Sequence, residues 1–258
     1  MIVGVMNNPA VPIDDELRWI ADAGFDFVDL TLEPPLAWPC DPRAVRDLLS
    51  ELGLGVVGHT AWYLPIASPF PELRRQAREL LREMLDAFAV IGADVVNVHP
   101  DRSARLVAAR DVVAANGETL ADLADEATVR GLRLMVENLG PPFASPEELR
   151  SILDAAPAAG FHLDVGHAHL GRDRDEPNRT EALLEAFGDR LAHVHVSDNL
   201  GVDDLHLPLG AGTVDWPAAV RALKGAGWDG TVTIEVFSPE RAHVEASRRL
   251  WLDWWGDA

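Results

Sequence analysis

The strongest constraint on the fold of this chain is a regular alternation between short apolar segments and longer amphipathic segments. Eight segments have the length and the apolar pattern of strands; they lie at residues 2–6, 27–32, 55–59, 95–99, 132–137, 161–164, 192–196 and 232–236. Eight segments with helical periodicity follow them in turn, at residues 13–23, 42–52, 71–91, 103–130, 146–155, 176–187, 215–226 and 239–255. This alternation predicts parallel strands joined by right-handed crossover helices.

Eight strand–helix units within 258 residues match a closed barrel. We therefore expect an α/β fold, a single parallel (β/α)8 TIM barrel, with residues 1–258 as one domain. An open, doubly wound sheet is the alternative, but it would normally carry a glycine-rich phosphate loop after the first strand, where this chain has Asn7, Asn8 and Pro9. Helix boundaries are also marked: Ser145 and Asp215 are expected N-caps, and glycines such as Gly53 and Gly92 end helices.

The composition limits the classes of partner. Asp and Glu number 42 against 22 Lys and Arg, so the formal net charge is −20, which disfavours nucleic acid without excluding it. The chain has no apolar run long enough for a membrane span, and its first ten residues do not resemble a secretory signal. One cysteine, Cys40, cannot form an internal disulfide. A cytoplasmic protein is expected.

Residue types that bind metal ions recur where the predicted strands end, which in a TIM barrel is the active face. These residues are Glu33, His59, His99, Glu137, Asp164, His167, His195, Asp204, His206 and Glu235. Each one alone could be a structural histidine or a carboxylate on the rim. Together they predict a divalent metal site, because buried carboxylates and imidazoles in one cluster need cations between them.

Other histidines and a tryptophan group are expected to have structural roles. His162 and His193 lie two residues before Asp164 and His195, which places them one layer deeper inside the barrel. His169 and His243 have no such placement and are expected to be structural or on the surface. Three tryptophans on the last helix have the spacing of one helix face and are expected to pack against the barrel: Trp251, Trp254 and Trp255.

Five motifs in order resemble the xylose-isomerase-like TIM-barrel superfamily, which contains sugar and sugar-phosphate isomerases and epimerases as well as the endonuclease IV family. The motifs are VENL at 136–139, LDVGH at 163–167, HVHVSDN at 193–199, HLPLGAGTVDW at 206–216 and TIE at 233–235. The resemblance covers essentially the whole chain. It implies the barrel fold and a metal site, but it does not select one activity.

Within the isomerase and epimerase branch, the resemblance implies one divalent ion, often Mn²⁺, held by the residues matching Glu137, Asp164, His195 and Glu235. The two glutamates would act as acid and base on a hydroxy-ketone, and His167 would hydrogen-bond the substrate. Ketose epimerases usually carry a further Glu and a further Arg at the positions held here by Phe143 and Gly201. This chain therefore departs from typical hexulose recognition.

The endonuclease IV branch implies three Zn²⁺ ions and nine ligands. Matching residue types occur here in order: His59, His99, Glu137, Asp164, His167, His195, Asp204, His206 and Glu235. Three such ions carry a charge of +6 against four carboxylates, which suits a phosphate ester. The alternative function is thus a trinuclear zinc phosphodiesterase or AP endonuclease, and a third is a barrel that binds metal without catalysis.

We favour a divalent-metal-dependent isomerase or epimerase of a small sugar, sugar phosphate or related hydroxy-ketone, with Mn²⁺ or Zn²⁺ and one to three ions as cofactor. The acidic composition disfavours a duplex substrate. Glu33 is a weak candidate for substrate contact. Gly210 and Gly212 could present amides to a substrate phosphate, although a tight turn that places Asp215 as a helix cap explains them equally.

Overall fold

The computed structural model describes residues 1–102, 106–171 and 178–258. Its eight parallel strands close into a barrel in the order β1 to β8, with β8 paired to β1. The strands are β1 (Ile2–Met6), β2 (Phe27–Thr31), β3 (Gly55–His59), β4 (Val95–Val98), β5 (Arg133–Glu137), β6 (Gly160–Asp164), β7 (Leu191–Val196) and β8 (Thr231–Ile234). The predicted (β/α)8 barrel is confirmed, and the open sheet is wrong.

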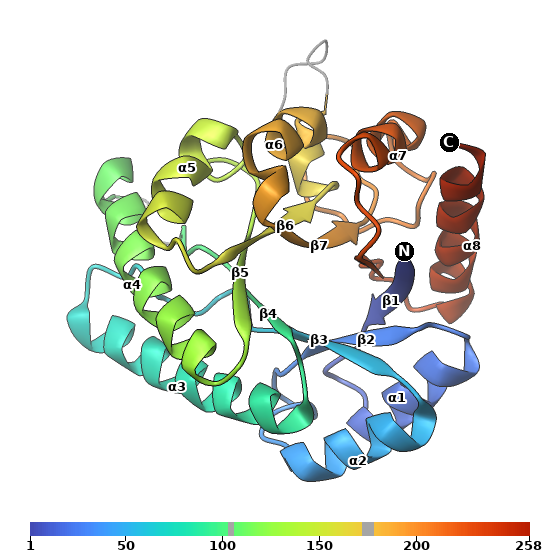
Figure 1. Cartoon of the computed structure of the whole chain (residues 1–258), viewed down its shortest axis with the longest axis horizontal. Coiled ribbons are helices and arrows are strands. Elements are labelled where there is room, and N and C mark those ends of the chain that lie inside the picture. Colours follow the sequence, from blue (N-terminus) through green and yellow to red (C-terminus); the bar gives the residue numbers. More distant parts are fainter. Residues whose placement is uncertain (103–105, 172–177) are drawn as a thin grey trace.

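Eight helices form a ring outside the strands (Figure 1). They are α1 (Ile13–Asp22), α2 (Pro42–Leu52), α3 (Pro71–Ile91), α4 (Ala109–Val129), α5 (Pro146–Ala155), α6 (Thr180–Phe187), α7 (Trp216–Gly225) and α8 (Arg241–Asp257). Two short 3₁₀ turns, His167–His169 and Gly188–Arg190, complete the regular structure of the described residues. In the described part of the chain, no helix is both long enough and apolar enough to cross a membrane.

Several predicted boundaries need correction. The helix expected from Ser103 begins at Ala109, and Leu106 to Ala108 precede it; Ser103 itself lies outside the described residues. The helix expected from Glu176 begins at Thr180, and Glu176 also lies outside the described part. The last helix begins at Arg241, two residues after the expected start. Amphipathic periodicity continues into the residues before a helix, so it locates a helix better than its first residue.

The strand ends differ by one or two residues in a way that matters for the site. β4 ends at Val98 and β8 at Ile234, so His99 and Glu235 stand just beyond the last paired residue. The predicted helix caps are confirmed: Asp215 accepts a hydrogen bond from the amide of Ala218, and Ser145 forms a capping box with Glu148. These caps fix where each helix begins after its strand.

Side chains fill the barrel interior in layers. Phe27, Val57 and Met135 form an apolar layer near the amino ends of the strands. His162 and His193 lie above it, fully buried, with the His193 ring centroid 5.9 Å from that of Phe27. The deeper position predicted for these two histidines is confirmed. The polar interior residues thus stand between this apolar layer and the carboxyl ends of the strands, where the predicted ligands lie.

The space between the strands and the helices is filled by aliphatic and aromatic side chains. Trp251 of α8 is fully buried, and its ring lies edge-on to Trp216 of α7 with centroids 6.1 Å apart. Trp254 stacks on Trp216, and Trp255 also packs against this core. The predicted packing role of the α8 tryptophans is therefore confirmed.

Candidate metal centre

Barrel closure brings together the nine predicted metal ligands that follow strands β3 to β8. They form three groups, and within each group one ligand atom of every residue lies within 4.8 Å of the others. The central group is Glu137, Asp164, His195 and Glu235; the His59 group is His59, His99 and Glu137; the His206 group is His167, Asp204 and His206. Glu137 belongs to two groups, so its two oxygens can serve two neighbouring cations.

The central group has the donor set and the unmet bonding capacity of a cation site. Each of its four residues has a buried polar atom without a hydrogen-bond partner among the described residues: Glu137 Oε1, Asp164 Oδ2, His195 Nδ1 and Glu235 Oε2. Burial of one such atom costs free energy unless something binds it. Three carboxylates and an imidazole suit Mn²⁺ or Zn²⁺, so the residues present fit a divalent ion.

The charges of the central group depend on one another. Burial opposes ionisation of Glu235, but His206 and His195 lie close and lower its pKa to about 2. Burial raises the pKa of Asp164 to about 7, and the negative charges of Glu235 and Glu137 add to this effect. In the absence of a cation, Asp164 is therefore only partly ionised at neutral pH.

The His59 group lies between β3 and β4. The Nε2 atoms of His59 and His99 are 3.2 Å apart, and His99 Nε2 is 3.0 Å from Glu137 Oε2. The Asn97 side chain donates from Nδ2 to the same Glu137 oxygen at 2.5 Å. His59 Nε2, His99 Nε2 and Glu137 Oε2 thus lie close enough together to bind one cation. The Asn97 side chain holds the Glu137 carboxylate in place.

The His206 group is built around one carboxylate oxygen. Asp204 Oδ2 lies 2.8 Å from His167 Nε2 and 3.1 Å from His206 Nε2. The opposite nitrogen of each ring lies beside a main-chain carbonyl oxygen: His167 Nδ1 is 3.0 Å from that of Asn138, and His206 Nδ1 is 3.2 Å from that of Glu235. Donation from Nδ1 to a carbonyl leaves Nε2 as the ligand atom, an arrangement common behind metal-bound histidines.

Without a cation, the histidines of this group are protonated. Burial opposes protonation of His206, yet Glu235 and Asp204 raise its pKa to about 9. Burial also opposes protonation of His167, and the charges of Asp164 and Asp204 raise its pKa well above the usual range. A cation bound to this group must therefore displace two protons.

A buried carboxylate anchors the loop between β7 and α7 that carries Asp204 and His206. Asp198 is fully buried. Its Oδ1 accepts from the amides of Asn199 and Val214, and its Oδ2 accepts from the amide of Gly210 and the indole of Trp216, at 2.9 to 3.2 Å. Four donors around one carboxylate fix both ends of the loop. Between them, His206 has a φ of +44°, which is rare for a residue with a side chain.

This anchor changes the interpretation of the glycine-rich turn. The amide of Gly210 is donated to Asp198, and a Cβ atom at Gly212 would overlap Asp198 Oδ1. The turn thus surrounds an internal carboxylate of the protein. Glu33 lies outside the three groups; it is half-buried and accepts a hydrogen bond of 2.9 Å from Thr31 Oγ1.

The sequence reasoning missed three polar residues beneath or beside the ligands: Asp29, Asn97 and Asp198. Asp29 lies two residues before the end of β2 and Asn97 one residue before the end of β4, whereas the prediction rested on strand ends alone. Asp29 is fully buried and contacts His59, His193 and His195. The available signal was a charged residue in the inward register of an otherwise apolar strand.

Comparisons with known proteins agree with this architecture. The family model described as xylose isomerase-like TIM barrel matches residues 17–254. A ketose 3-epimerase of Arthrobacter globiformis is 27% identical over 255 residues, which cover 92% of this chain and 82% of that protein.

Two solved structures share the fold over almost their full lengths. A D-tagatose 3-epimerase-like protein superposes with a TM-score of 0.87 at 24% identity, covering 100% of this chain and 98% of the other. The TTHB071 protein from Thermus thermophilus, studied after soaking with ZnCl₂, has a TM-score of 0.79 at 26% identity and covers 100% and 99%.

Proposed function

Because this chain belongs to the xylose isomerase-like TIM barrel family, we propose that it is a divalent-metal-dependent isomerase or epimerase of a small sugar or related hydroxy-ketone. The observation that carries the proposal is the convergence of four buried, unpartnered ligand atoms from Glu137, Asp164, His195 and Glu235 among the described residues. The similarity to a ketose 3-epimerase supports the substrate class.

The central group would hold the cation. A divalent ion held there would supply Lewis-acid polarisation of the substrate's oxygens, which makes the C–H bond of the hydroxyl-bearing carbon next to the carbonyl more acidic. Burial of the four ligands keeps bulk water away from them, which strengthens their interaction with charge.

Glu137 and Glu235 are proposed as the base and the acid. They follow β5 and β8, so they approach the bound substrate from different sides of the barrel. One carboxylate would take a proton from the substrate carbon, and the other would return a proton to the carbon skeleton. Their pKa values are lowered by the surrounding histidines, although burial opposes this, so either carboxylate can act as the base. The glutamate that acts as the acid must take up a proton before it can return one to the substrate.

His167 is proposed to assist by binding the substrate. Its Nδ1 atom lies 3.0 Å from Glu137 Oε1, so its ring borders the central group. Contact between a substrate phosphate and Gly210 or Gly212 is not part of the proposal, because Asp198 already accepts the Gly210 amide.

Deuterium exchange tests the reaction. The protein loaded with Mn²⁺ or Zn²⁺ is incubated in D₂O with a panel of ketoses, and incorporation at carbon is measured by mass spectrometry and NMR. We expect incorporation to accompany turnover and to fall by about 10² or more in Glu137→Gln, the usual size of a lost acid–base contribution. Glu240→Gln, which changes an exposed glutamate after β8, is the control and should match the wild type.

Elemental analysis tests the site itself. We expect divalent metal in the purified protein and reduced occupancy in Glu235→Gln, because the amide replaces a charged ligand. Equal metal content in Glu235→Gln and wild type would contradict the assignment of Glu235. Tight metal binding without exchange on any ketose would instead favour a non-catalytic barrel.

A second candidate function is supported by the geometry of the two additional groups. The nine residues gather as three neighbouring sets of ligands, which is the arrangement expected for a trinuclear phosphodiesterase. This candidate predicts about three Zn²⁺ ions per chain, cleavage of an oligonucleotide with an abasic site, and loss of cleavage in His59→Gln. Oligonucleotide cleavage without deuterium exchange would replace the isomerase proposal with this one.

A further inference from the structure

We propose that Asp29 is a positioning residue that fixes the tautomers of His195 in the central group and His59 in the His59 group, and so orients the candidate ligands of both groups together. The inference rests on the proposed metal site, but not on the proposed reaction.

Asp29 is the acceptor at the centre of a buried hydrogen-bond network. Its Oδ2 lies 2.6 Å from His195 Nε2, 3.2 Å from His193 Nε2 and 2.9 Å from Thr233 Oγ1. Its Oδ1 lies 3.3 Å from His59 Nδ1. Thr233 Oγ1 donates to Asp29 Oδ2, and three ring nitrogens face the two oxygens of Asp29 within hydrogen-bond distance. A carboxylate surrounded by these groups acts as the acceptor, so the nitrogens that face it carry the protons.

The position of these protons decides which nitrogen can bind a metal. A neutral imidazole has one N–H and one lone pair, so a proton on Nε2 of His195 leaves the lone pair on Nδ1. That Nδ1 atom lies 3.1 Å from Glu235 Oε2 and 4.0 Å from Asp164 Oδ2, within the central group. Asp29 thus directs the lone pair of His195 toward the other three ligands.

The same reasoning applies to His59 on the other oxygen of Asp29. A proton on His59 Nδ1 leaves the lone pair on Nε2, the atom that lies 3.2 Å from His99 Nε2. One carboxylate therefore orients a ligand from β3 and a ligand from β7, which belong to different groups. A change at Asp29 is expected to affect both groups at once.

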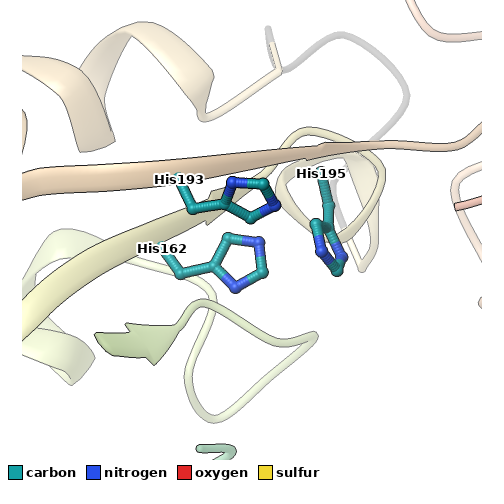
Figure 2. A group of neighbouring side chains, drawn as sticks. All are labelled: His162, His193 and His195. Carbon is teal, nitrogen blue, oxygen red and sulfur yellow. The ribbon is translucent and has the colours of Figure 1, made fainter. Parts of the chain in front are cut away.

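The histidines beneath the site support this network. Figure 2 shows His193 and His195 projecting from the same strand, β7, with His162 beside His193. Both ring nitrogens of His193 have partners: Nδ1 lies 2.6 Å from Thr231 Oγ1, and Nε2 lies 2.9 Å from Thr233 Oγ1. These contacts use the nitrogens that a deeper cation would need. We therefore assign His193 to the support of Asp29 and not to a further metal site.

The first test is a direct measurement of tautomers in the wild-type protein. Protein labelled with ¹⁵N-histidine and loaded with Zn²⁺ is studied by long-range ¹H–¹⁵N correlation NMR, with assignments from single histidine substitutions. We expect His195 to carry its proton on Nε2 and to bind Zn²⁺ through Nδ1, and His59 to carry its proton on Nδ1. A proton on Nδ1 of His195 would overturn the proposal.

The second test uses Asp29→Asn with Thr233→Val as the matched control. An asparagine keeps the shape but replaces one acceptor oxygen with an NH₂ donor, so one of the facing rings must move its proton to its ligand nitrogen. We expect Zn²⁺ affinity, measured by competition with a chelator, to fall about 10- to 100-fold, together with a changed tautomer at His195 or His59. Thr233→Val removes one hydrogen bond to the same Asp29 oxygen but keeps the carboxylate.

The comparison with Thr233→Val shows whether Asp29 acts by fixing the histidine tautomers or only by stabilising the structure around them. We expect Thr233→Val to retain wild-type tautomers and Zn²⁺ affinity within about threefold, since it keeps the carboxylate that fixes them. Equal losses of affinity in the two variants would overturn the proposal, and the wild-type spectrum decides alone if Asp29→Asn does not fold. Correct tautomers without deuterium exchange on any ketose would retain the role of Asp29 and reject the proposed reaction.

Discussion

Asn97 donates a hydrogen bond of 2.5 Å to Oε2 of Glu137, the glutamate shared by the central group and the His59 group. Asn97 lies on β4 and Glu137 ends β5, so this contact joins neighbouring strands below the ligands. The other oxygen of Glu137, Oε1, lies 3.0 Å from His167 Nδ1. The amide therefore holds Oε2 beside His99 of the His59 group.

Replacement of Asn97 should weaken the site without removing a ligand. In Asn97→Ala, Glu137 loses the donor that orients it, and we expect the affinity for a divalent ion to fall about tenfold, the lower end of effects of this kind. Chelator competition measures the change. Asn97→Asp is a contrasting variant, because a second negative charge beside Glu137 should strengthen cation binding or add a ligand. Wild-type affinity in Asn97→Ala would show that Glu137 needs no such support.

Metal binding should depend on pH in a defined direction. Burial, with Glu235 and Glu137, raises the pKa of Asp164 to about 7, and a carboxylate must lose its proton to bind a cation. We expect the apparent affinity to rise with pH and to fall about tenfold or more per pH unit below about pH 7, as protons compete with the metal. Isothermal titration calorimetry in several buffers gives both the affinity and the number of protons released. Constant affinity from about pH 5 to about pH 8 would contradict the prediction.

The loop between β7 and α7 should depend on the carboxylate of Asp198, which accepts hydrogen bonds from both ends of the loop. In Asp198→Asn, the new NH₂ group faces at least one main-chain amide that donates a hydrogen bond to Asp198 in the wild type. Each hydrogen bond lost in this way destabilises the fold by about 1 to 3 kcal/mol. We expect the Tm to fall by about 2 to 10 °C, together with a lower metal content if the His206 group also holds an ion. Calorimetry and elemental analysis measure the two effects. Asp203→Asn, an exposed neighbour in the same loop, is the control.

The apolar layer of Phe27, Val57 and Met135 provides a test of packing that does not involve the metal site. A Cβ atom at Gly4 would overlap the ring of Phe27, so Gly4→Ala must displace that ring. We expect a loss of about 1 to 3 kcal/mol and a Tm lower by about 2 to 10 °C. Gly225→Ala, where a Cβ atom would meet nothing within 4 Å, should be neutral or slightly stabilising. Equal effects of the two substitutions would contradict this packing.

Much of the fold could be predicted because its signals are local. The capping residues Ser145 and Asp215 act within their own helices, and the two-residue period of β6 and β7 sufficed to place His162 and His193 one layer below the ligands. The start of α4 could not be predicted in the same way. Ala108 precedes it without a side-chain cap, so no sequence signal marks the first helical residue.

The sequence by itself determined which strand ends carry imidazoles and carboxylates, because that requires only the strand positions and the common direction of parallel strands. Only the tertiary structure decided which of them share a cation site. Closure and tilt of the barrel set which strands face one another across the interior. Asp29 and His195 are 166 positions apart in the chain, yet their side chains lie 2.6 Å from each other. Spacing along one strand carries no information about such a pair, because the opposite wall of the barrel supplies the partner.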